Sequence, residues 1–126
     1  MALLFPVHVG TTSGAARDAM RAGVLQYYKN LQTIFSALPE SYGEHVPRLR
    51  VIEENVANLP FERFCRDQAV FGDAAEVVDR LQAARDEFDL SQIICWFDQG
   101  AMLPRQEVER TMRDFAERVM PKLASA

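Results

Sequence analysis

The sequence lacks the features that mark membrane and secreted proteins. No apolar run among its 126 residues approaches the length that spans a bilayer. The N-terminal stretch MALLFPVHV has no basic lead-in and no small-residue cleavage site, so it does not resemble a secretory signal. Two cysteines, Cys65 and Cys95, are too few for a disulfide framework. We therefore expect reduced core thiols in a cytoplasmic protein with no membrane partner.

Positive charge is also scarce. The chain carries 14 Lys and Arg against 18 Asp and Glu, a formal net charge of −4, and it has no Lys/Arg cluster. This balance disfavours nucleic acid as a partner. The sequence contains no glycine-rich dinucleotide or phosphate loop, no C-x-x-C, no H-E-x-x-H and no G-x-S-x-G. It therefore predicts no metal site and none of the enzyme classes that depend on these motifs.

What remains is typical of one globular domain, because 48% of the residues are hydrophobic. We divide it into a strand–helix unit over 1–38, an irregular insertion over 39–70 and a helix–strand–helix unit over 71–126. The first strand is Leu3–Val9, where Pro6 indicates an edge or a bend. The helix that follows runs from about Gly14 to about Leu38, with an apolar stripe at helical spacing. The stripe consists of Ala16, Met20, Val24, Tyr27, Leu31, Ile34 and Leu38.

The third unit has the clearer signals. Asp73 and Glu76 have the spacing of a capping box at the start of a helix. The strand Gln92–Phe97 contains an apolar run without polar alternation, which predicts burial on both faces. A last helix begins near Pro104, and Pro121 is expected to end its regular hydrogen bonding. Alternating helices and strands of this kind predict an α/β fold.

Several short segments of this unit resemble the C-terminal end of the luciferase-like, flavin-dependent monooxygenases. They are Phe71-Gly72-Asp73, Val77-Val78-Asp79-Arg80-Leu81, Trp96-Phe97 with Gly100, Leu103-Pro104, Met112, Phe115-Ala116 and Val119-Met120-Pro121. The closing Phe-Ala…Val-Met-Pro is the most specific part, and the match covers roughly the last two-fifths of the chain. The resemblance implies the last strand and last helix of a TIM barrel, with FMN as the cofactor if the family activity is retained.

The number of strands limits this reading. A closed barrel has eight parallel strands in about 250 residues, whereas this sequence predicts two parallel strands and three or four helices. We therefore expect a partial TIM-barrel-like fragment, and a two-stranded sheet is not stable alone. Dimerisation would complete the sheet, and a homodimer is favoured because it is the commonest assembly. A separate subunit is the alternative.

Candidate site residues gather after the two strands, where parallel α/β sheets bind ligands. His8 and Asp98 are the obvious base and orienting acid. The structural interpretation is that His8 is a strand histidine with its hydrogen bonds satisfied and that Asp98 is a turn residue. Potential substrate-binding groups at this edge are Thr11, Thr12, Trp96 and Gln99, with a core or dimer contact as the structural interpretation of Trp96. The loop after the long helix adds His45 as a third candidate catalytic residue and Tyr42 as a binding residue. The charged residues of the last helix are expected to form a solvated face.

Three functions stay open at this point. The first is an oxidoreductase subunit of the luciferase-like family, or a tailoring protein of a biosynthetic pathway. The second is a flavin-free homodimer that binds a small hydrophobic metabolite or catalyses a non-redox step. The third is a structural partner that completes another barrel. The flavin-free alternative is favoured on physical grounds, because the resemblance implies that most flavin-holding residues belong to the missing first two-thirds of the barrel.

Overall fold

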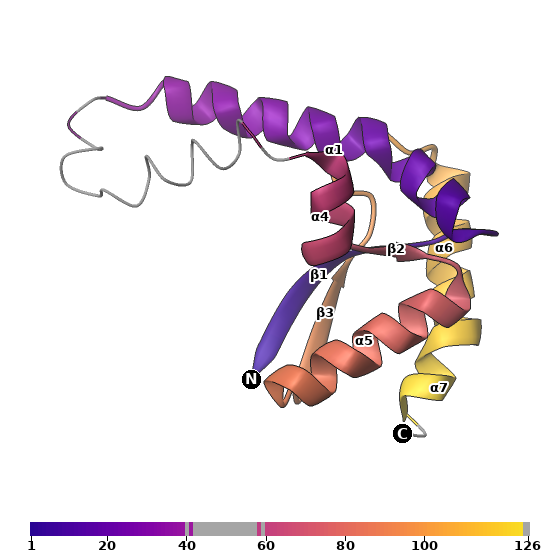
Figure 1. The fold of residues 1–126 in the computed structure, drawn as a ribbon. Coiled ribbons are helices and arrows are strands. Elements are labelled where there is room, and N and C mark those ends of the chain that lie inside the picture. Colours follow the sequence, from indigo (N-terminus) through magenta and orange to yellow (C-terminus); the bar gives the residue numbers. More distant parts are fainter. Residues whose placement is uncertain (40, 42–57, 59, 125–126) are drawn as a thin grey trace.

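The computed structural model describes residues 1–39, 41, 58 and 60–124. Three parallel strands form one sheet in the order β2-β1-β3, with helices between and after them in the chain (Figure 1). The elements are β1 (Ala2–Val9), α1 (Ser13–Ser36), α4 (Phe61–Asp67), β2 (Val70–Gly72), α5 (Ala74–Phe88), β3 (Gln92–Trp96), α6 (Arg105–Asp114), the π-helical turn η1 (Phe115–Val119) and α7 (Met120–Ala124).

The first strand is central, so the expectation that Pro6 marks an edge or a bend is wrong. Strand β1 pairs with β3 from Ala2 to Pro6 and with the much shorter β2 from Val7 to Val9. Main-chain groups of alternate residues face opposite neighbours, and the amide of Gly10 donates to the carbonyl of Gly72 on the β2 side. The nitrogen at position 6 faces the same side, before β2 begins. Proline therefore removes no hydrogen bond from the sheet.

Each face of the sheet has its own hydrophobic core. On one face Val7 and Val9 pack with Val77 and Leu81 of α5 and with residues of η1. On the opposite face Phe71 of β2 packs with the first half of α1 and with α4. The alternating direction of strand side chains explains this division, since Val70 and Phe71 are neighbours in sequence but belong to different cores.

The α/β class is confirmed, but the parallel sheet in the described part of the chain has three strands rather than the expected two. The additional strand, Val70–Gly72, is fully buried and spans the expected boundary between the irregular insertion and the third unit. The adjacent parallel pair β1–β3 with α5 and η1 on one face is an arrangement found between neighbouring barrel strands. Strand β2 and the helices on the opposite face are additional to that arrangement. No helix within the described parts of the chain is long and apolar enough to cross a membrane.

The third unit follows its local signals closely. Asp73 accepts a hydrogen bond from the amide of Glu76, so the predicted cap is confirmed. The last helix loses its regular hydrogen bonding at Phe115–Val119, before Pro121, rather than at the proline as expected. It widens into the π-helical turn Phe115–Val119, where the amide of Met120 bonds to the carbonyl of Phe115, and α7 continues from there. A π-turn changes the hydrogen-bonding pattern locally, so the helix accommodates a proline that lacks an amide.

The prediction that Gln92–Phe97 is buried on both faces is wrong. Strand β3 is an edge strand whose residues are all partly or largely exposed, and Ile94 is 45% exposed. Its neighbour in register on β1, Leu4, is 52% exposed. The outer half of α1 extends beyond the sheet (Figure 1), and its part of the predicted apolar stripe is not buried. The monomer thus exposes apolar surface that its sequence pattern would place inside a protein.

Candidate functional site

A close crossing holds the loop after β3 against α1. Gly23 lies in the middle of the helix, and a Cβ there would overlap the main-chain oxygen of Gln99. Gly100, at φ +89°, packs equally closely against the main chain of Gly23. The left-handed conformation and the contact both favour glycine. Because of this contact, residues that follow β3 lie beside Tyr27 and Tyr28 of α1.

His8 lies near the carboxyl end of β1 and is fully buried. Its Nε2 is 3.6 Å from Oε1 of Glu107, which is slightly too long for a hydrogen bond, and neither ring nitrogen has a partner within the described residues. Burial lowers the pKa of His8, and the nearby Arg110 acts in the same direction, whereas Glu107 and Asp98 oppose the shift. The imidazole is therefore neutral near pH 7, the form in which a histidine can accept a proton.

Three charged residues of α6 surround this end of β1. Arg110 forms a very short ion pair with Glu107, donates to Asp114 at 2.7 Å and reaches the carbonyl oxygen of Val9 at 3.2 Å. The Arg110 guanidinium holds the pKa of the Glu107 carboxyl below its usual range. We expected these residues to belong to a solvated face, but they are partly buried and link α6 to β1.

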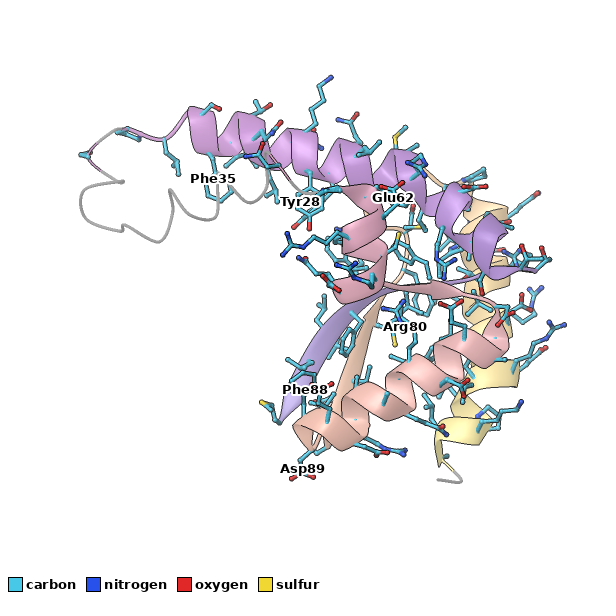
Figure 2. All side chains as sticks on the ribbon, in the orientation of Figure 1. Tyr28, Phe35, Glu62, Arg80, Phe88 and Asp89 are labelled. Atoms are coloured by element: carbon cyan, nitrogen blue, oxygen red, sulfur yellow. The ribbon has the colours of Figure 1, made fainter. Side chains whose placement is uncertain are left out.

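A groove of about 430 Å³ lies on the sheet face opposite α5, between the strands, α1 and α4. Aromatic rings line it, and their contacts form a continuous row. Trp96 meets Tyr27 edge to face at 5.2 Å, Tyr27 meets Tyr28 at 5.4 Å, and Tyr28 meets Phe64 at 5.5 Å between ring centroids. Leu4 and Pro6 contribute from β1, and Phe88 contributes from the end of α5. Figure 2 shows Tyr28 directed from α1 toward α4, with Phe88 at the far end near the N-terminus.

Few polar groups accompany this apolar lining. Gln99 lines the groove, is 2% exposed, and has an amide oxygen without a partner among the described residues. Asp67 is the one charged residue that the described parts of the chain contribute to the lining, and it is paired with the exposed Arg66. A pocket of this size with apolar walls and a few polar groups is typical of a site for a small molecule.

The structure brings together two of the predicted binding residues and separates the others. Trp96 and Gln99 share the groove. The side chain of Asp98 accepts a hydrogen bond from the amide of Leu103 at 3.1 Å. The acid beside His8 is Glu107 instead of the predicted Asp98. Thr12 caps α1 by accepting from the amide of Ala15.

Thr11 is exposed in the turn before α1 and is not one of the residues that line the groove. Tyr42 and His45 lie outside the described residues. Both cysteines are free, and burial raises the pKa of each thiol. In the parts of the chain that the structure describes, no group of three or more His, Cys, Asp or Glu side chains is placed to hold a metal ion.

Sequence reasoning missed the aromatic residues of α1 and the acid beside His8. Tyr27 belongs to the predicted apolar stripe, but Tyr28 and Phe88 gave no sign that they share a groove with Trp96. Glu107 lies in the first turn of α6, after Pro104, and only its distance to His8 identifies it as a candidate site residue. Comparison of the chain with protein-family models and with curated proteins found no match.

Proposed function

We propose that this protein binds a small, flat, apolar molecule in the groove, with one polar group of that molecule hydrogen-bonded to the amide of Gln99. The buried and unpartnered amide oxygen of Gln99, beside a row of aromatic rings, carries the proposal. A buried polar atom without a partner costs about 1–3 kcal/mol, and a ligand with a hydrogen-bond donor would recover part of that cost. The aromatic walls favour a ring system by edge-to-face contact.

A flavin-dependent reaction of the luciferase-like type is the second candidate, favoured by the barrel-like pairing of β1 with β3. The apolar walls of the groove suit a flat ring system. The phosphate of FMN suits it poorly, because the charged residue that the described part of the chain contributes to the lining is an acid, Asp67. The groove therefore supports a neutral ligand better than FMN, and the flavin-free function is the one we favour.

Two matched probes test the binding proposal. 2-Naphthol has a hydroxyl that can bond to the Gln99 amide, and 2-methylnaphthalene has the same ring system without it. Both are expected to shift the indole N–H resonance of Trp96, the one tryptophan of the chain, in an NMR titration. 2-Naphthol should bind about five- to tenfold more tightly, since a net hydrogen bond contributes about 1 kcal/mol.

Three variants serve as tests and control. Gln99→Leu should abolish the difference between the two probes. Phe88→Ala should weaken both probes, because it removes a groove wall, and at 43% exposure that side chain is less important to folding than a fully buried one. Leu25→Ala, at a 51% exposed site on α1 outside the groove lining, should bind like the parent. If neither probe shifts the Trp96 resonance at its solubility limit in the buffer, the proposal is overturned.

The binding protein is further proposed to act as a homodimer. The exposed apolar residues on β1 and β3 and the free edge of the sheet support it, since unprotected edges tend to pair with another chain. The mass of the protein in solution tests this part. A value of twice the 14.3 kDa chain is expected, and a value of one chain at all concentrations refutes it.

A further inference from the structure

The two edges of the sheet differ in how they are protected. Strand β2 has three residues and all are buried, so it is short and covered. Strand β3 has five residues, Gln92–Trp96, and each is partly or largely exposed. Natural edge strands usually carry lysine, proline, a bulge or an inward charge that prevents pairing with another chain. The sequence QIICW contains none of these residues, so β3 is an edge without protection.

The register of the sheet identifies which main-chain groups of β3 are available. Gly10 donates to the β2 side, so the odd-numbered residues of β1 face β3. Leu3 and Phe5 therefore bond to the even-numbered residues of β3, given the pairs Leu3–Ile93 and Phe5–Cys95. The amide and carbonyl groups of Ile93 and Cys95 point away from the sheet. Among the described residues no strand pairs with that side.

We propose that β3 pairs antiparallel with β3 of a second copy of this chain, about a two-fold axis at Ile94. This inference rests on the homodimer of the proposed function and specifies its interface. In this register Ile93 of each copy exchanges both main-chain hydrogen bonds with Cys95 of the other. Ile94 lies opposite Ile94 of the second copy, and the two sheets become one continuous sheet.

The absence of charge on β3 makes this edge a better place for a second copy to bind than most other surfaces of the chain. Two chains that each carry a net charge of −4 repel one another on average. Strand β3 has no charged residue, so its self-pairing opposes no like charges within the strand. A two-fold axis also requires a self-complementary surface. An apolar strand that pairs with itself through its own main chain meets that requirement.

The pairing would also affect the groove. Even-numbered residues of β3 share the face on which Trp96 lines the groove. Gln92 of the second copy would lie opposite Trp96 on that same face. The second copy would therefore add an amide group to the edge of each groove, and the dimer would contain two grooves on one side of its sheet.

A charge-swap experiment tests the interface. Ile94→Lys places two ammonium groups opposite one another, and Ile94→Glu does the same with carboxylates. Each variant should raise the dimer dissociation constant at least about tenfold, by like-charge opposition and loss of apolar contact. An equimolar mixture of the two variants should dimerise again, because Lys then faces Glu. That recovery cannot come from a variant that merely fails to fold. Leu25→Lys, at a similarly exposed site away from the edge, is the control.

Crosslinking tests the register. Ile93→Cys should form an interchain disulfide with Cys95 of the second copy on mild oxidation, since hydrogen-bonded antiparallel pairs have Cα atoms about 5.5 Å apart, within disulfide range. Gln92→Cys, which would lie opposite Trp96 on the other face, should not. A dimeric parent whose Ile94→Lys variant stays fully dimeric would overturn the β3 interface but leave the homodimer intact. A monomeric parent would overturn both.

Discussion

Two glycines of α1 provide a sharp test of the packing that builds the groove. Gly14 lies in the first turn of the helix and Gly23 in its middle; by helix propensity alone alanine is worth up to about 1 kcal/mol at the interior site and less in the first turn. The structure predicts opposite outcomes. A Cβ on Gly14 has no atom within 4 Å, whereas a Cβ on Gly23 overlaps the main-chain oxygen of Gln99. The neighbour at Gly23 is backbone, so it cannot move aside as a flexible side chain would.

The magnitude follows from these two terms. Overpacking of a close contact costs typically about 1–3 kcal/mol, and main-chain overlap belongs at the upper end of that range. After subtraction of the propensity gain, Gly23→Ala should destabilise the protein by about 1–2 kcal/mol, and Gly14→Ala should be neutral or stabilising by less than about 1 kcal/mol. For a chain of this size each kcal/mol corresponds to a shift of about 4 °C in Tm.

Thermal and urea unfolding of the two variants beside the parent measure the difference. Tryptophan fluorescence adds a local readout, because Trp96 contacts Tyr27 one helical turn from Gly23. Gly23→Ala should change the emission of Trp96, and Gly14→Ala should leave it unchanged. Equal stability of the two variants, with unchanged emission in both, would refute the close crossing of the loop and α1.

Two further predictions concern the carboxyl end of β1. Burial holds the pKa of His8 in the folded protein below its ordinary value of 6.5, so near that pH the unfolded chain binds more protons at this residue than the folded chain does. The stability that the neutral imidazole contributes is therefore fully present above pH 6.5. It falls as the pH drops through 6.5 toward the lower pKa of the folded protein. Urea unfolding between pH 7.5 and 5.5 should show this loss, with a shallower slope in His8→Gln; an identical slope would contradict a buried neutral imidazole. Thr111 accepts from the buried amide of Val9 at 2.8 Å, so Thr111→Val should cost about 1–3 kcal/mol and Thr111→Ser much less, as measured by urea unfolding. A Thr111→Val protein as stable as the parent would show that this amide finds another partner.

The elements that sequence reasoning placed correctly are those with local signals. The cap at Asp73 and the apolar periodicity of Val77 and Leu81 act within one helix, so they can be read from neighbouring residues. The strand at Gln92 is also local, because a run of β-branched and aromatic residues favours extended backbone. These features required no knowledge of the rest of the chain.

Several features that sequence reasoning missed depend on contacts between distant segments. Strand β2 has only three residues, and it becomes a strand because β1 is beside it. The central place of β1 was hidden because Pro6 reads as an edge residue unless the length of β2 is known. Glu107 reads as a surface residue of an amphipathic helix until α6 is placed against His8. Gly23 reads as a weak point of its helix until Gly100 is placed against it.

The wrong prediction for β3 is informative in a different way. A run without polar alternation is typical of a strand covered on both faces, and in this chain that run is the exposed edge of the sheet. Burying Ile94 fully relative to leaving it exposed is worth about 1.5–3 kcal/mol, so the monomer forgoes part of that free energy at 45% exposure. Leu4 beside it forgoes a similar amount at 52%. A second copy on the β3 edge would recover part of it at Ile94, and an apolar ligand in the groove would recover part of it at Leu4, its neighbour in register. The two proposals therefore predict coupling: a probe that fills the groove should tighten the dimer, and Ile94→Lys should weaken the probe. Probe affinity that is independent of protein concentration across the dimer transition would separate them.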